Sequence, residues 1–407
     1  MNEGRYTGTE LPSQLIPQGT PYILWLASWY PTKTVPNNGD FIQRHAYAVS
    51  IYHQIVLVHT IHDPNSEKSV YFDITKRKNL IELIIYFPDP GPGNSIFDKI
   101  GYNIRYYEVT RKIINDLFRN YSYPTFVHLH VPMKMGIIAL WIKKRWKIPF
   151  LVSEQSASYL REAPDHYFSR NWYFRNCVKQ IFKNALAVTN VSENVGSVLQ
   201  KVFSISRLFV VRNTVDEKSF YFKEKSIEKF QFIHVSTLSY QKNTEGLIKS
   251  FEIFADQRND VELIMVGPVS ANIRDIVNNS SVSSKITMTG EIPYEEVASR
   301  MQASNCFVLF SRYENFPCVI IEALCCGLPV ITSNTGGAGE ALDNTNGIVI
   351  SSGDEAELVI AMSKIMAQYQ SYNREKISQE ARAEYNYSSI GMKFNEVYKT
   401  LQLLENK

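Results

Sequence analysis

The sequence has no apolar run near the roughly 20 residues that a transmembrane helix needs, and its N-terminus lacks the apolar segment of a signal peptide. Cysteine is also scarce. The five cysteines are odd in number and mostly lie in apolar runs, which is typical of buried thiols in a reducing compartment and not of a disulfide framework. We therefore expect a cytoplasmic protein, with any membrane contact peripheral and at the inner face.

Motifs for several common chemistries are missing as well. No G-x-x-x-x-G-K-[ST] occurs, and no G-x-G-x-x-G follows a candidate first strand, so P-loop hydrolysis and dinucleotide redox chemistry lose support. There is no Cys-x-x-Cys and no Asp-x-Asp, which leaves no obvious ligands for a divalent metal. His128 and His130 could share a strand face, but no acidic or histidine partner follows at close spacing. We expect neither a metal nor a resident cofactor.

The composition is that of an ordinary globular protein, with 407 residues, 44% hydrophobic and 20% charged, and the length suits two domains. Charge is unevenly placed. Residues 1–218 contain 26 Lys and Arg against 17 Asp and Glu, whereas residues 219–407 contain 17 against 23. The first half is therefore basic, although we expect no nucleic-acid partner.

Residues 1–20 are polar and aperiodic, so we expect a mobile leader. From residue 21, short apolar runs alternate with helix-length segments, which predicts parallel sheets in an α/β fold. We expect a Rossmann-like N-terminal domain at 21–212, a second at 213–387 and a C-terminal helix at 388–407. The predicted strands are 23–27, 55–60, 83–87, 126–131, 149–153, 185–191 and 208–211, then 232–236, 262–266, 286–289, 307–310, 330–332 and 348–350.

The most informative stretch is Ser311–Val330, S-R-Y-E-N-F-P-C-V-I-I-E-A-L-C-C-G-L-P-V. A strand should end near its start, and Pro317 suits the first turn of a helix. The loop at 314–316 would then open a helix whose free backbone N–H groups form an anion site. Inside that helix, Glu322 can accept two ribose hydroxyls, while Glu314 reaches a more distant hydroxyl. The alternative is that both glutamates only favour a helix N-terminus.

This Glu-x7-Glu pattern, with Asn-Phe-Pro inside it and Gly336-Gly337 after it, resembles the donor-binding segment of retaining glycosyltransferases of family 4. Those enzymes have the GT-B fold, in which two Rossmann-like, doubly wound domains face each other across a cleft. The similarity keeps the family's order over roughly residues 22–400. The segments 28–31 with 38–41, 211–216 and 235–243 resemble its first loop, its hinge and its strand-loop ending in lysine.

The resemblance implies a donor site in the second domain. Lys242 would neutralise the donor diphosphate as a compact charge, and the backbone amides of Asn315 and Phe316 would bind the β-phosphate and the sugar. Glu322 would hold the ribose, and Glu314 a sugar hydroxyl as one of two catalytic residues. The competing interpretation of Lys242 is a solvated surface lysine.

Three glycines and a histidine complete the implied site. Gly336 and Gly337 would let main chain approach the nucleotide, and Gly39 would bring N-domain backbone to the diphosphate, although plain turns are the alternative use. His130, the second implied catalytic residue, would lie at the cleft and hydrogen-bond near the transferred sugar. The alternative is a buried structural histidine, a role that suits His128 better.

The chain departs from the family pattern at two positions. Gln155 follows Glu154 where the family often has histidine, so Glu154 is only a candidate acceptor-side residue. Thr237 stands where many members carry an arginine beside the diphosphate. Losing that contact would weaken donor binding by roughly 1.5–3 kcal/mol unless another cation replaces it.

The expected function is metal-independent, retaining transfer of a sugar from a nucleotide diphosphate sugar to an acceptor hydroxyl, in bacterial-type polysaccharide or glycolipid assembly. The acceptor, a glycan or a lipid-linked molecule, would meet the basic N-terminal domain. Two aromatic and basic segments, 141–147 and 167–183, are suited to an anionic bilayer. The alternative is a solvated helix face with its aromatic rings in the core.

Two other classes stay open. One is a non-catalytic GT-B scaffold or partner subunit that binds a nucleotide sugar, supported by Thr237. The other is a sugar-nucleotide epimerase, which would turn over the donor without an acceptor. A dehydrogenase is disfavoured by the missing glycine motif, and NAD binding would revive it.

Overall fold

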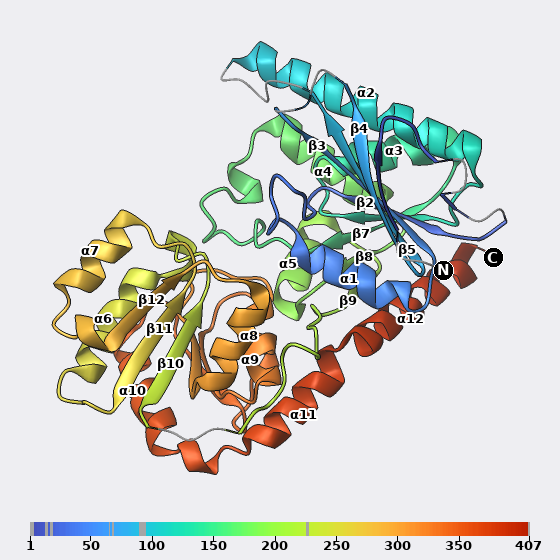
Figure 1. The fold of residues 1–407 in the computed structure, drawn as a ribbon. Helices are drawn as coiled ribbons and strands as arrows, with labels where there is room; N and C mark the ends of the chain where they lie inside the picture. The colour runs from blue at the N-terminus through green and yellow to red at the C-terminus, as the bar shows by residue number, and fades with distance from the viewer. Residues whose placement is uncertain are drawn as a thin grey trace.

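The protein consists of two α/β domains, each built on its own sheet, and a C-terminal helix that runs from the second domain back to the first (Figure 1). The structure is a computed structural model. It describes residues 4–12, 15–16, 19–64, 66, 69–88, 95–224 and 228–405.

The N-terminal sheet has the strand order β1-β4-β5-β3-β2-β6-β7-β8-β9 within the described residues. From β5 to β9 all neighbours are parallel, whereas β1 and β4 add an antiparallel edge. The strands are β1 (Gly4–Gly8), β2 (Ile23–Ala27), β3 (Ile55–His62), β4 (Tyr71–Arg77), β5 (Leu80–Phe87), β6 (Val127–His130), β7 (Phe150–Glu154), β8 (Val188–Asn190) and β9 (Leu208–Val210).

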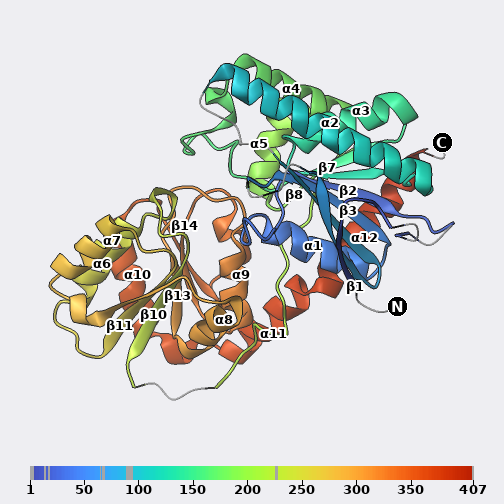
Figure 2. The ribbon, with the colours of Figure 1, turned by 45° about the horizontal axis from the view of Figure 1, so that its top comes forward.

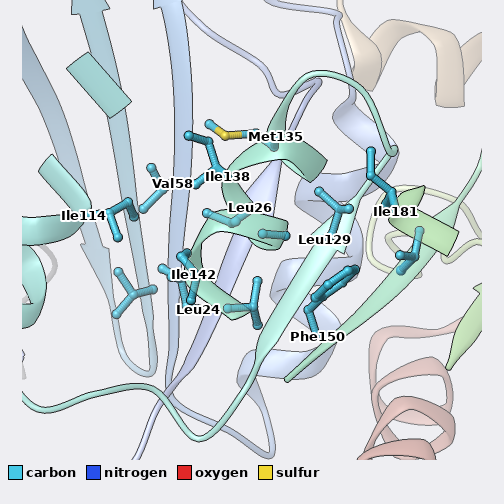
Figure 3. Close-up of a cluster of buried hydrophobic side chains, with 14 of the residues drawn as sticks. Leu24, Leu26, Val58, Ile114, Leu129, Met135, Ile138, Ile142, Phe150 and Ile181 are labelled. Carbon is cyan, nitrogen blue, oxygen red and sulfur yellow. The ribbon is translucent and has the colours of Figure 1, made fainter. Parts of the chain in front are cut away.

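Helices cover both faces of this sheet because its parallel strands are apolar on both sides. Leu24 and Leu26 of β2 face one core, and Trp25 between them faces the other. In the first core, side chains of α3 pack on β2, β6 and β7 (Figure 3). The helices are α1 (Asp40–Ser50), α2 (Ile96–Asn120), α3 (Met135–Trp146), α4 (Trp172–Asn184) and α5 (Glu193–Phe203).

The second sheet is entirely parallel, with the order β12-β11-β10-β13-β14-β15. Residues of α6, α7 and α10 form the core on one face, and residues of α8, α9 and α11 form the core on the other. The strands are β10 (Phe230–Val235), β11 (Val261–Val266), β12 (Ile286–Gly290), β13 (Cys306–Leu309), β14 (Val330–Ser333) and β15 (Gly347–Ile350). The helices are α6 (Thr244–Ala255), α7 (Ala271–Asn279), α8 (Tyr294–Ala303), α9 (Cys318–Cys325), α10 (Glu355–Ala367) and α11 (Arg374–Tyr385).

Both sheets reverse their strand order at one point, between β2 and β6 in the first and between β10 and β13 in the second. In open α/β sheets, ligands bind outside the carboxyl ends of the strands at such a switch point. The loops that follow these four strands carry Gly39, the segment after His130, Lys242 and Glu314. The topology therefore brings the residues singled out in the sequence to the two switch points.

The C-terminal helix α12 (Tyr387–Glu405) packs on α1 of the N-terminal domain (Figure 2). Its apolar residues at helical spacing are buried there: Ile390, Phe394, Val397, Tyr398 and Leu401. Gly391 lies against the backbone carbonyl of Ala48, where a Cβ atom would collide. The missing side chain thus allows the two helices to approach closely.

The N-terminal segment differs from our expectation. Residues 4–8, which we expected in a mobile leader without regular structure, form β1 and pair with β4. Leu15 and Ile16 are buried, whereas residues 1–3, 13–14 and 17–18 lie outside the described residues. The expectation was wrong for 4–8 because hydrophobic periodicity does not mark an edge strand whose residues are almost all exposed.

Within the described ranges, no helix combines the length and the apolar character that crossing a bilayer requires.

Candidate active site

Lys242 and Glu314 form an ion pair at the switch point of the second sheet. Lys242 follows β10, Glu314 follows β13, and Lys242 Nζ lies 2.5 Å from Glu314 Oε1. Ser311 Oγ donates to the same carboxylate oxygen at 2.7 Å. Both charged side chains are largely buried, so the pair presents a cation and a carboxylate together at the carboxyl edge of the sheet.

The loop after Glu314 is held by Ser192 and Ser156 of the other domain and by Asn213 at the domain boundary. Ser192 Oγ donates to Asn315 Oδ1 at 2.6 Å, Asn315 Nδ2 donates to the Ser156 carbonyl at 3.3 Å, and Asn213 Nδ2 donates to the Phe316 carbonyl at 2.6 Å. The backbone N–H groups of Asn315 and Phe316 donate to no group in the part of the chain that the structure describes. They lie just before α9, where a helix start favours an anion.

Gly336 and Gly337 let their loop lie directly on the Glu314–Asn315 segment. Gly336 has a φ of +52°, and a Cβ atom there would collide with the Glu314 carbonyl. Gly337 donates its backbone N–H to the Asn315 carbonyl at 2.7 Å, and its α-carbon faces Ser192 of the first domain. The contacts of both glycines are thus with protein in this structure, and they fix the shape of the donor-side loop.

Glu322 is bound across the domain boundary. Arg44 of α1 donates to Glu322 Oε1 at 2.6 Å, and Tyr294 Oη, at the start of α8, donates to the same oxygen at 2.7 Å. Arg44 also pairs with Asp40 at 2.7 Å. Burial, and secondarily the Glu322 charge, raises the pKa of Tyr294 far above its usual value, so its hydroxyl stays a donor. Glu322 Oε2 has no such partner within the described residues.

Sequence reasoning missed Arg44 and Tyr294. A signal for Arg44 was present, because it is a charged residue on the buried face of α1, beside Ile42 and Ala46. Such a residue needs a partner when buried. No pattern in the sequence links Arg44 to a carboxylate 278 positions away.

Gly39 begins α1 with a φ of +74°, and a Cβ atom there would meet the backbone of Trp29 and Tyr30 at 2.7–2.8 Å. The position therefore requires glycine. The loop after β2 folds back on itself at this contact, which sets where α1 begins. Arg44, one turn into α1, then reaches the second domain.

The catalytic role expected for His130 at the cleft stays a prediction. Although it ends β6, its side chain has no exposed surface and stacks between Trp25 and His128, with ring centroids 4.0 Å away in each case. Burial lowers its pKa well below the usual value, with the neighbouring His128 adding to this, so the ring is neutral. Alternation along β6 places His130 on the same face of the sheet as His128. His128 is bonded to Tyr398 and Ser153, at 2.7 Å each.

Glu154 ends β7 and is also buried. Its carboxylate accepts the backbone N–H groups of Gln155 and Ser156 at 2.9 and 2.8 Å and the Tyr159 hydroxyl at 2.9 Å. Burial raises its pKa in spite of these bonds. The carboxylate therefore shapes the loop after β7.

A cavity of about 740 Å³, here called the N-domain cavity, opens at the carboxyl ends of the first sheet. Lys134 Nζ lies 4.2 Å from the ring centroid of Tyr102, and burial lowers the pKa of Lys134 to about 8. Aromatic rings and cations together suit a glycan that carries apolar or anionic groups. Residues lining the cavity include Trp29, Tyr107, Lys134, Glu154, Arg170 and Tyr173.

A second cavity, of about 510 Å³, lies at the loop after β10. Thr237, which departs from the family pattern, and Arg312 both line it. The Arg312 guanidinium stacks 4.2 Å from the Tyr240 ring centroid and donates to the Tyr240 carbonyl at 2.5 Å. Arg312 thus supplies a cation to the cavity that Thr237 also lines. Elsewhere, no cluster of three or more His, Cys, Asp or Glu that could hold a metal occurs among the residues described.

Comparison with known proteins agrees with this arrangement. Residues 216–384 match the model of the family described as "Glycosyl transferases group 1". One component of the phosphatidylinositol N-acetylglucosaminyltransferase of Arabidopsis thaliana is 23% identical over 220 residues, 53% of this chain and 48% of that protein. The match spans about half the length of that relative.

Two solved structures share the fold over nearly the whole chain. Sucrose-phosphate synthase from Thermosynechococcus elongatus superposes with a TM-score of 0.74 at 17% identity, covering 95% of this chain and all of that one. Anabaena Alr3699/HepE in complex with UDP gives 0.68 at 14% identity, covering 93% and 100%. These similarities and the two mainly parallel sheets show the GT-B fold, with two Rossmann-like domains. Within the chain, the similarity to the glycosyl transferases group 1 covers residues 216–384, which lie in the second domain.

Proposed function

We propose that the protein transfers a sugar from a nucleotide diphosphate sugar to an acceptor hydroxyl, with retention at the anomeric carbon and without a divalent metal ion. The observation that carries this proposal is the Lys242–Glu314 pair beside the free amides of Asn315 and Phe316. A preorganised cation and helix-end amides stabilise an anion without reorganisation at the moment of reaction.

Each donor group has a partner in this proposal. The diphosphate binds Lys242 and the two amides. A sugar hydroxyl donates a hydrogen bond to Glu314 and replaces part of the contact between Glu314 and Lys242. The ribose hydroxyls donate to Glu322 Oε2, because Oε1 is already bound by Arg44 and Tyr294. Gly39, Gly336 and Gly337 shape the loops around the donor. His130, the second catalytic residue of the proposal, ends β6 and is buried in this closed structure.

The reaction breaks the bond between the anomeric carbon and the phosphate oxygen and forms one to the acceptor oxygen on the same face. The leaving phosphate takes the proton of the acceptor hydroxyl, so no protein base is needed. Charge on the leaving diphosphate passes to Lys242 and the amides. The closed contact between the domains, seen at Asn315 and Ser192, excludes water and limits donor hydrolysis.

The acceptor would be a glycan or a lipid-linked glycan bound in the N-domain cavity, in polysaccharide or glycolipid assembly. The name of the Arabidopsis relative, which includes phosphatidylinositol, supports a lipid-bearing acceptor. The UDP bound by HepE makes a uridine nucleotide the first donor to test. We propose that the enzyme acts in the cytoplasm.

A thermal-shift panel of UDP, GDP, ADP, their sugar conjugates and NAD tests the proposal. One nucleotide series should raise the melting temperature with ligand concentration. Glu322→Ala should reduce the shift. Lys242→Ala should lower the transfer rate about 100-fold or more, while Lys249→Ala, at an exposed lysine of α6, should not. Full transfer by Lys242→Ala would refute the mechanism.

The same assay separates the other classes. Binding without turnover in any acceptor mixture would indicate a scaffold, turnover without acceptor an epimerase, and a shift with NAD alone a dehydrogenase. Transfer by protein treated with EDTA should match transfer in added Mg²⁺ or Mn²⁺. A requirement for either ion would contradict metal independence.

A further inference from the structure

Large apolar side chains are exposed at the starts of two neighbouring helices of the N-terminal domain. On α2, Phe97 (83% exposed), Ile100 and Ile104 follow the spacing of one helix face. On α4, Trp172 (72% exposed) and Tyr173 begin the helix. These five residues are called the apolar rim. Such residues are exposed singly on most proteins, but a group of them marks an interaction site.

The apolar rim borders the N-domain cavity. Lys99, Asn103 and Tyr107 of α2 and Tyr173 of α4 line that cavity. Tyr107 of α2 and Tyr173 of α4 thus lie on the wall of one cavity, which brings the two helices together at this point. Both helix starts lie on the same side of the N-terminal domain in two views (Figures 1 and 2). A molecule in the cavity therefore lies next to the rim.

The surface around the rim is basic. α4 contains Arg175, Lys179 and Lys183 and no acidic residue, and Lys99, Arg105 and Arg170 are exposed nearby on the two helix starts. Four exposed acidic residues lie among these cations, Asp98, Glu108, Glu162 and Asp165, and Asp165 pairs with Arg170 at 3.6 Å, so the cations are in excess. Cations interleaved with tryptophan, tyrosine and aliphatic side chains match the interface of an anionic bilayer.

The other aromatic and basic segment, 141–147, does not form such a surface. Trp146 packs edge-on against Phe118 and Trp141, with centroids 5.0 and 4.9 Å away, and Arg111 stacks on Trp141. Its rings belong to the contact between α2 and α3. Of the two aromatic and basic segments suggested by the sequence, only 167–183 therefore contributes exposed rings to the apolar rim.

We propose that the apolar rim inserts into the interface of an anionic membrane, so that the N-domain cavity opens at the bilayer surface and takes an acceptor whose apolar part stays in the membrane. This inference rests on the proposed function for the nature of the acceptor. The docking itself rests on the rim alone. Apolar burial and attraction to anionic headgroups add in such binding.

Vesicle cosedimentation tests the docking. The wild type should bind vesicles of phosphatidylcholine with phosphatidylglycerol at low salt, and bind pure phosphatidylcholine vesicles about tenfold less. The variant Phe97→Ser/Ile100→Ser/Ile104→Ser should lose about tenfold in binding to the anionic vesicles. The control Ile253→Ser/Ile360→Ser replaces residues exposed by 63% and 65% on the second domain, and should bind as the wild type does.

Two further readouts keep the result decisive. The thermal shift with nucleotide should be the same for the rim variant and the wild type, which shows that the variant is folded and separates docking from donor binding. Failure of every nucleotide to bind would refute the proposed function and leave the vesicle result standing. Docking is refuted if the wild type does not bind anionic vesicles, or if the rim variant binds them equally well. Light scattering that shows a dimer broken by the rim substitutions would also refute it and assign the rim to a second copy.

Discussion

The two glutamates of the candidate site differ in where their partners come from. Glu314 pairs with Lys242 inside the second domain, so this pair persists whether the domains are closed or apart. Glu322 is bound by Tyr294 of its own domain and by Arg44 of the other. The surroundings of the first glutamate are therefore independent of domain closure, whereas those of the second depend on it.

The burial of Lys134 leads to a prediction about how folding stability depends on pH. Its ammonium group lies over tyrosine rings, and burial lowers its pKa to about 8 from 10.5. Between these values the unfolded chain holds the proton and the folded chain does not, so stability rises with pH through this window. Lys134→Met lacks this titration, so its stability relative to the wild type should fall from pH 7 to pH 10. We expect a fall on the order of 1 kcal/mol, since the partial exposure of Lys134 reduces the full effect.

Urea unfolding of both proteins at several pH values measures this difference. Lys144→Met, an exposed lysine on the same helix, is the control and should give a constant difference. A constant difference for Lys134→Met too would mean that the folded protein keeps Lys134 protonated throughout the window.

Single residues were predictable where they follow a strand. The family resemblance indicated Lys242 and Asn315, and Glu314 follows a predicted strand. Parallel strands bring such loop positions to one edge of the sheet. The ring direction of His130 was not predictable in the same way. The alternation that places it at the end of β6 also turns it into the core with Trp25, and the sequence does not say which face is covered.

At the scale of elements, the buried parallel strands were the predictable part. All thirteen predicted strands overlap strands of the structure, because buried runs between helices have a strong signal. The two antiparallel strands, β1 at the edge and β4 beside it, were not predicted. In β4, inward residues such as Phe72 and Ile74 alternate with polar ones, so the strand has no continuous apolar run of the kind that marked the predicted strands. In β1 almost every residue is exposed, so local sequence carries little information about pairing.

The packing of α12 on α1 depends on a residue without a side chain. Gly391→Val would force a side chain against the Ala48 carbonyl and Tyr52. We expect a loss of about 2 kcal/mol of unfolding free energy, in spite of the better helix propensity of valine over glycine. Denaturant unfolding checks this, with Met392→Val, at an exposed position of the same helix, as the control. If both variants unfold at the same denaturant concentration, α1 and α12 accommodate the new side chain without loss of stability.

At the scale of the whole molecule, the contacts between the domains set the closed arrangement. Ser192 and Ser156 bind the Asn315 side chain, and Glu340 accepts the N-terminal backbone amides of α5 at 2.9 Å while pairing with Arg212. These partners lie far apart in the sequence and come from loops. Periodicity and motifs could predict two domains facing each other, but not which side chains meet.

Arg44 gives the clearest test of this closure. In Arg44→Met the buried carboxylate of Glu322 loses its cation, and an uncompensated buried charge costs about 3–5 kcal/mol. Opening of the cleft returns Glu322 to water and relieves that cost, so the molecule should open before it unfolds. A penalty of about 3 kcal/mol shifts the ratio of closed to open molecules more than 100-fold.

Small-angle scattering of the protein without donor should show a larger radius of gyration for Arg44→Met. Arg300→Met, which breaks an exposed pair within α8, should leave it unchanged. A radius equal to that of the wild type in Arg44→Met would mean that the remaining contacts hold the domains closed, and that Glu322 tolerates burial through Tyr294 alone.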